Sequence, residues 1–177
     1  IPPNAAAIVL NRPHSITADV KIPSGGAEGI LLAHGGNDAG YSFYMKNGKL
    51  HWAHNYVARD IYHVESKETV PEGRHKLRFE FEVTGKPDFK QGKGAPGRAQ
   101  LYIDGKLVGQ INVPVTTPLL LGLTGAVTCG AAHAAPITPD YKPPFEFTGT
   151  IYSVTVDVSG ELIKDDEAEM RSIMARQ

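Results

Sequence analysis

The alternation of hydrophobic and polar residues predicts β-strands along most of this chain. It is clearest at 76–83, where Leu77, Phe79, Phe81 and Val83 alternate with charged residues. Because successive side chains of a strand point to opposite faces, this order predicts a sheet with one dry face. The sheet should therefore cover a core on one side and present charges to solvent on the other.

The dipeptide Asp104-Gly105, which lies between two apolar runs, predicts a hairpin with a two-residue turn. A type I′ turn needs positive φ at both central positions, and glycine adopts positive φ without a Cβ clash. A turn of this length fixes the register of the two strands. The expected cross-strand pairs are Ile103 with Lys106, Tyr102 with Leu107 and Leu101 with Val108.

Asn47-Gly48 predicts a second hairpin, which joins 41–46 to 49–57. Its first face is aromatic, and core packing is our first interpretation because soluble domains seldom expose contiguous apolar patches. A sugar-stacking platform is the alternative, with Trp52, Tyr44 and His51 as the candidate ligand face. The expected pairs are Met45 with Leu50, Phe43 with Trp52 and Tyr41 with His54 on one face, and Tyr44 with His51 on the other.

Further short strands are expected before, between and after these hairpins. They cover residues 5–10, 15–22, 28–34, 61–66, 107–113 and 145–158. Many turn-punctuated strands without intervening helices predict an all-β fold, an antiparallel β-sandwich of the jelly-roll kind, over a single domain of residues 1–177.

Only the tail of the chain has a helical pattern. Residues 164–177 carry a narrow apolar stripe of Met170, Ile173 and Met174. A helix this short is marginal alone, so we expect it to dock on this domain or on a neighbour. The stripe is our candidate docking contact.

Composition excludes some partners and leaves others open. The formal net charge of −1 gives no electrostatic reason to expect nucleic acid or an anionic membrane as a partner. No apolar run approaches the roughly 18 residues of a membrane span. The only cysteine, Cys129, can form neither an intrachain disulfide nor a multi-thiolate metal site.

Catalytic signals are weak. Glu80 and Glu82 alternate onto one face, about 7 Å apart along the strand, which is within the range of paired glycosidase carboxylates. Lys76 and Arg78 share that face, so a solvated charged surface is the preferred interpretation and a glycosidase the third hypothesis.

The seven histidines show no metal-ligand spacing. His51 and His54 fall on opposite faces of their strand, and His14, His34, His63, His75 and His133 are scattered along the chain. We therefore expect no metal site and no catalytic residue in this chain.

Blocks of sequence along nearly the whole chain resemble the C-terminal region of large bacterial arylsulfatases. None of them is a catalytic signature, but they occur in the same order. The blocks are Asn11–Val20, Gly25–Gly29, Gly35–Tyr44, Pro71–His75, Leu101–Val108, Pro143–Ile151 and Val154–Val158.

The resemblance implies a concanavalin A-like sandwich appended to a sulfatase catalytic domain. That domain uses a Cys or Ser in a C/S-x-P-S-R motif, matured to formylglycine, and a divalent cation such as calcium. Neither cofactor is expected in this chain, because Cys129 is followed by Gly-Ala-Ala. Such tails often have Asp-Val-Gly-x-Asp-x-Gly before the Pro-Pro-Phe block, and residues 127–133 of this chain lack those acids, which puts any ion contact there in doubt.

The resemblance makes an accessory role our main functional hypothesis. The chain would be the non-catalytic C-terminal domain of a sulfatase-type hydrolase, packed on the catalytic domain of the same or a parent polypeptide or on a homo-oligomer partner. The alternative is a carbohydrate-binding module of concanavalin-like fold. A periplasmic or secreted location is favoured over a cytoplasmic one.

Overall fold

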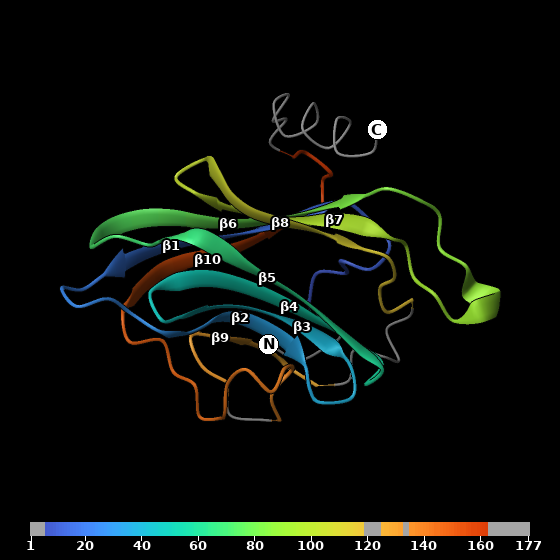
Figure 1. Ribbon diagram of the computed structural model, residues 1–177, viewed down its shortest axis with the longest axis horizontal. Helices are drawn as coiled ribbons and strands as arrows, with labels where there is room; N and C mark the ends of the chain where they lie inside the picture. The colour runs from blue at the N-terminus through green and yellow to red at the C-terminus, as the bar shows by residue number, and fades with distance from the viewer. Residues whose placement is uncertain (1–5, 119–124, 133–134, 163–177) are drawn as a thin grey trace.

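Two five-stranded antiparallel sheets pack face to face in the computed structural model, which describes residues 6–118, 125–132 and 135–162 (Figure 1). Sheet A has the strand order β10-β1-β6-β7-β8, and sheet B has the order β5-β4-β3-β2-β9. The strands are β1 (His14–Ile22), β2 (Gly29–Gly35), β3 (Gly40–Lys46), β4 (Lys49–Tyr56), β5 (Asp60–Thr69), β6 (Gly73–Val83), β7 (Gly97–Ile103), β8 (Lys106–Val113), β9 (Val127–Cys129) and β10 (Thr150–Asp157), with one 3-10 turn, η2 (Phe89–Gln91). The expected antiparallel β-sandwich is confirmed.

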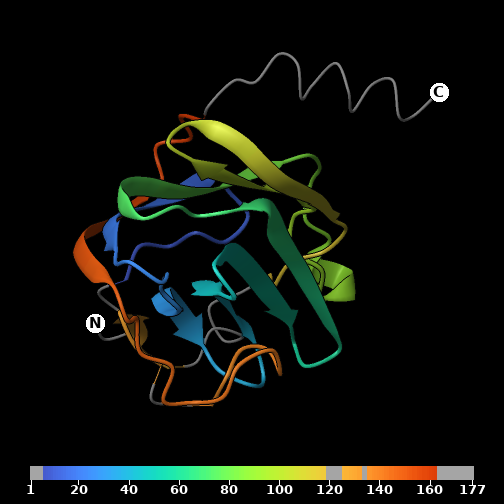
Figure 2. The same cartoon turned by 60° about the vertical axis from the view of Figure 1, so that its left-hand side comes forward.

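The apolar faces of the two sheets form a common core between the two layers, whose arrangement Figure 2 shows. Phe79 of sheet A lies at the centre of the aromatic contacts. Its ring is 4.5 Å from that of Trp52, at an interplanar angle of 12°, and 6.4 Å from that of Phe43. The first face of the β3–β4 hairpin is therefore core, as its main interpretation predicted.

Both predicted hairpin turns are present. Asn47 and Gly48 have φ values of 51° and 72°, and all the pairs expected around them are observed. The Asp104-Gly105 turn also has positive φ at both positions, but a register shift between Leu101 and Tyr102 pairs Leu101 with Gly109 instead of Val108. A β-bulge adds one residue to a strand without a turn signal, so turn chemistry alone could not predict it.

The strand expected at 5–10 is wrong, because residues 6–13 form turns and irregular backbone. Asn11 explains the break. It has φ 54°, and its side chain accepts a hydrogen bond from Ala95 N at 2.8 Å and donates one to Pro118 O at 2.9 Å. The segment is thus tied to the loops at one end of the sandwich instead of to a neighbouring strand.

The last strand, β10, is shorter than expected, and one of its residues faces the other way. Simple two-residue alternation would put Tyr152 on the same face as Val154 and Val156, which pack against the core. A register shift occurs between Asp19 and Val20, and Tyr152 is 51% exposed beneath the Arg74 guanidinium, which lies 4.3 Å from its ring centroid. The shift leaves Tyr152 as an extra, unpaired residue of β10, because Asp19 pairs with Ser153 and Val20 with Ile151. Such a bulge interrupts the alternation of side chains along the strand.

The expected helix at 164–177, with Met170, Ile173 and Met174, lies outside the described residues. Within the part of the chain that the structure describes, no helix is long and apolar enough to cross a membrane.

Two core histidines make the fold sensitive to acid. Burial lowers the pKa of His14 and of His54 from 6.5 to about 4. His54 Nε2 accepts a hydrogen bond from Thr117 N at 3.1 Å, which only the neutral ring can do. The unfolded chain binds these protons at higher pH than the folded protein.

We therefore predict that stability is full above pH 6.5 and falls as the pH falls from 6.5 towards 4. Linkage gives a slope of up to about 1.4 kcal/mol per pH unit for each histidine. Urea unfolding at several pH values measures it. Gln at position 54 cannot titrate but can still accept from Thr117 N, so His54→Gln should reduce the slope. An unchanged slope in this variant would contradict the assignment.

Candidate functional site

The outer face of sheet B is partly covered by the segment 130–148, of which the structure describes residues 130–132 and 135–148. Backbone hydrogen bonds attach the segment to β2, from Ile30 N to Phe145 O and from Gly130 N to Leu31 O. A second apolar cluster lies beneath it, and Figures 1 and 2 both place this segment (orange) against sheet B. The cluster contains Ile30, Ala33, Tyr44, Ala53, Ala132 and Tyr141, with Phe145 packed against it.

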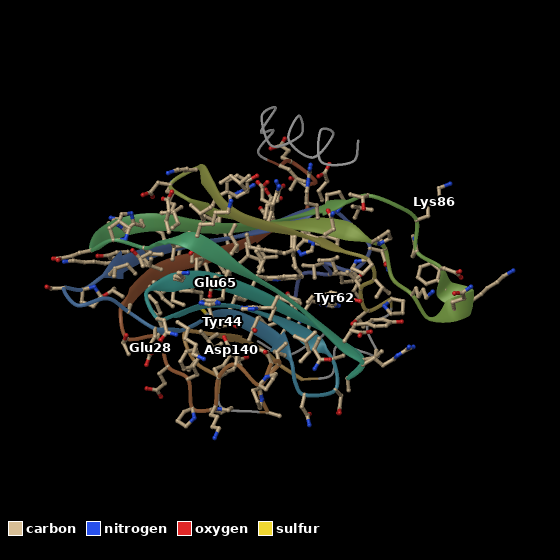
Figure 3. The ribbon with its side chains drawn as sticks, in the orientation of Figure 1. Glu28, Tyr44, Tyr62, Glu65, Lys86 and Asp140 are labelled. Carbon is tan, nitrogen blue, oxygen red and sulfur yellow. The ribbon has the colours of Figure 1, made fainter. Side chains whose placement is uncertain are left out.

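A polar cluster borders this apolar patch, and we call it the histidine–aspartate cluster. It consists of Tyr44 and Lys46 from β3, His51 from β4, His63 from β5 and Asp140 from the covering segment. Figure 3 shows Tyr44, Asp140 and the neighbouring Glu65 at this face. The sequence placed His63 among scattered histidines and did not single out Asp140.

Asp140 is the anchor of the covering segment. Its two carboxylate oxygens accept separate bonds, Oδ2 from the Tyr44 hydroxyl at 2.7 Å and Oδ1 from Lys46 Nζ at 2.8 Å. Burial alone would raise the pKa of Asp140, but these bonds from Lys46 and Tyr44 hold it below its usual value. Asp140 is therefore a carboxylate at neutral pH.

The two histidines meet edge to edge. His51 Nδ1 lies 3.0 Å from His63 Nε2, and the two rings are within 9° of parallel. His51 is buried and His63 is exposed, so the cluster reaches from the protein interior to solvent. Burial lowers the pKa of His51, which keeps its ring neutral.

Trp52 does not belong to this face. It is 3% exposed and packs against Phe79 in the core, on the opposite side of β4 from His51. The candidate ligand face of Trp52, Tyr44 and His51 is corrected accordingly, because strand alternation sends neighbouring positions to opposite sides of the sheet. Tyr44 and His51 do lie together, but Tyr44 is fully buried and offers no open ring.

The solvated face expected around Glu80 is also wrong. Glu80 has no exposed surface, lies between Ser15 and Gln100 on the adjacent strands, and accepts a bond from Arg78 Nε at 2.7 Å. Glu82 pairs with Arg98. Each carboxylate therefore pairs with an arginine of this protein, and the fully buried Glu80 cannot reach a substrate as the paired carboxylates of a glycosidase must.

An open pocket of about 440 Å³ lies at the end of the sandwich. One of its lining residues, Asn47, directly follows Lys46 of the histidine–aspartate cluster in the sequence. We call it the end pocket. Figure 3 shows Glu28 at this end of the molecule. Its lining residues are Gly25, Gly26, Ala27, Glu28, Asn47, Gly48 and Thr148.

The walls of the end pocket are held by hydrogen bonds and by close backbone packing. Thr148 N donates to Glu28 O at 2.8 Å, and Glu28 N donates to Thr148 Oγ1 at 3.0 Å. Gly29, with φ 121°, packs so closely that a Cβ there would lie 2.2 Å from Glu146 O. Val70 N bonds to Gly48 O at 2.8 Å on the opposite wall. The pocket is therefore preformed.

Comparison with known proteins identifies the fold. The chain is similar to the CBM40 of the Ruminococcus gnavus IT-sialidase bound to α2,3-sialyllactose, at 17% identity and a TM-score of 0.58, over 89% of this chain and 81% of that one. It is also similar to mouse laminin α1 LG4-5, at 12% identity and a TM-score of 0.64, over 92% and 39% of the two chains. The leech intramolecular trans-sialidase matches at 15% identity and a TM-score of 0.61, over 89% of this chain and 23% of the enzyme.

No protein-family model and no curated protein matches the sequence. At such low identities the structural matches establish the fold alone, because one fold hosts many functions. The fold shared with these neighbours agrees with the concanavalin-like sandwich, and the comparisons show no link to a sulfatase.

We predict that Asp140→Ala destabilises the fold by about 1–3 kcal/mol, because the buried Tyr44 hydroxyl would lose its acceptor. Asp140→Asn keeps a carbonyl oxygen for Tyr44 and should cost less. Urea unfolding of both variants measures the difference. Equal stability of Asp140→Ala and the unsubstituted protein would show that Asp140 does not anchor the segment.

Proposed function

We propose that this chain is a glycan-binding module that holds its ligand in the end pocket. The observation that carries the proposal is a preformed pocket lined by two exposed polar side chains, those of Glu28 and Asn47, that have no described hydrogen bond or ion pair. The third polar side chain of the lining, Thr148, bonds to the backbone of Glu28. Support comes from the shared fold, since the CBM40 of R. gnavus binds sialyllactose on a similar sandwich.

The end pocket presents hydrogen-bonding groups suited to sugar hydroxyls. The Asn47 amide can donate and accept, and the Glu28 carboxylate can accept from two adjacent hydroxyls. Both residues are exposed, and neither side chain has a described hydrogen bond or ion pair. Gly25 and Gly26 have open space where a Cβ would lie, which leaves room for a ring.

The charge of the end pocket favours an uncharged sugar. Glu28 is the only ionisable residue in its lining, and no cation accompanies it. The carboxylate of a sialic acid would be repelled by Glu28 and would find no arginine or lysine among the residues that line the pocket. We therefore propose a neutral glycan, in contrast to the sialylated ligands of the R. gnavus module.

An accessory role beside a sulfatase catalytic domain remains a prediction from the sequence resemblance. It is compatible with glycan binding, because a binding module can be attached to a hydrolase. Its candidate contact at Met170, Ile173 and Met174 lies outside the described residues.

Screening on an array of neutral and sialylated oligosaccharides, followed by calorimetric titration of the strongest ligand, tests the proposal. We predict binding of neutral glycans and roughly tenfold weaker binding for Glu28→Gln and for Asn47→Gly, since a bond to a charged or amide group contributes about 1–2 kcal/mol. Glycine at position 47 keeps the positive φ of the turn.

The matched control is Glu146→Gln, which removes an exposed carboxylate outside the pocket lining and should leave affinity unchanged. The proposal fails if no glycan binds, or if both pocket variants bind as well as the unsubstituted protein.

A further inference from the structure

We propose that His51, His63 and Asp140 form a binding site for a divalent transition metal of the zinc type. One ligand atom from each residue lies within 4.8 Å of the other two. Two imidazoles and a carboxylate are a donor set that zinc and its neighbours in the first transition series accept. The site is independent of the proposed glycan pocket.

The hydrogen bonds fix which nitrogen of His51 faces the site. His51 Nε2 lies 3.1 Å from Lys46 O, a carbonyl that can only accept, so Nε2 carries the proton. Nδ1 of His51 is then unprotonated, and its lone pair is directed at His63. Histidine ligands of zinc commonly donate their other N–H to a backbone carbonyl in the same way.

His63 can supply the second nitrogen lone pair of the site. Its Nε2 lies 3.0 Å from His51 Nδ1 and 3.3 Å from the Tyr44 hydroxyl oxygen, so without metal the Nε2 proton is shared between these acceptors. The ring is exposed, and its neutral form can carry the proton on the solvated Nδ1 instead. A metal ion would then replace that proton between the two imidazoles.

Only small movements are needed. With bonds of about 2.0–2.1 Å and tetrahedral angles, ligand atoms lie roughly 3.4 Å apart. The histidine nitrogens would separate by a few tenths of an ångström from 3.0 Å, and a carboxylate oxygen of Asp140 would move inward from at most 4.8 Å. The exposed side of His63 leaves a fourth position for water or another ligand.

The surrounding charges predict moderate affinity. Lys46 and Lys49 balance Asp140 and Glu65, with which they pair at 2.8 Å and 2.9 Å, so the site carries no excess negative charge to attract a dication. Binding therefore depends on imidazole coordination. Calcium and magnesium prefer an all-oxygen shell and should bind far more weakly.

Titration of untagged protein with ZnCl₂ by calorimetry tests the site, and Co²⁺ absorption reports its geometry. We expect one Zn²⁺ per chain, visible d–d bands of tetrahedral Co²⁺, and no heat with Ca²⁺. His63→Gln, at an exposed position, should weaken Zn²⁺ binding about tenfold or more.

The matched control is His75→Gln. His75 Nδ1 lies 2.6 Å from Asp104 Oδ2, and among the described residues this histidine–carboxylate pair belongs to no group of three possible metal ligands. This variant should bind Zn²⁺ as the unsubstituted protein does. Absence of stoichiometric binding, retention of binding in His63→Gln, or loss of binding in His75→Gln would each overturn the proposal.

Discussion

The side chains of the β3–β4 hairpin point alternately to its two faces, and the rest of the structure depends on this constraint. Alternate residues of this hairpin build two different surfaces. Phe43 and Trp52 meet Phe79 in the core between the sheets, while Tyr44 and His51 face outward. A slip of one residue would exchange the two sets and would place an imidazole in the core and an indole at the surface.

The outward face of this hairpin also attaches the segment 130–148. Tyr44 combines an apolar ring, packed on Tyr141 at 5.2 Å, with a hydroxyl bonded to Asp140. One side chain thus holds the segment through both kinds of contact. The same turn residues that set the register, Asn47 and Gly48, line the end pocket, so fold and proposed ligand site depend on one short segment.

The sequence predicted the fold well where turn chemistry and alternation agree, as at Asn47-Gly48 and β6. The prediction failed at Tyr152 and at Leu101, where a bulge adds one residue to a strand and shifts the pairing register. A bulge has no fixed residue signature, so nothing in the sequence indicated it. The pairing of His51 with His63 was missed for a related reason. The turn between β4 and β5 uses positive φ at Val57 and Ala58, residues that rarely adopt it, so no turn was evident there.

Fluorescence quenching of Trp52 tests this arrangement most directly, because Trp52 is the only tryptophan in the chain. The native protein should show blue-shifted emission that iodide does not quench, and denaturant should restore both the red shift and the quenching. Red-shifted native emission that iodide quenches freely would place Trp52 at the surface and contradict the observed division of the hairpin into a core face and an outer face.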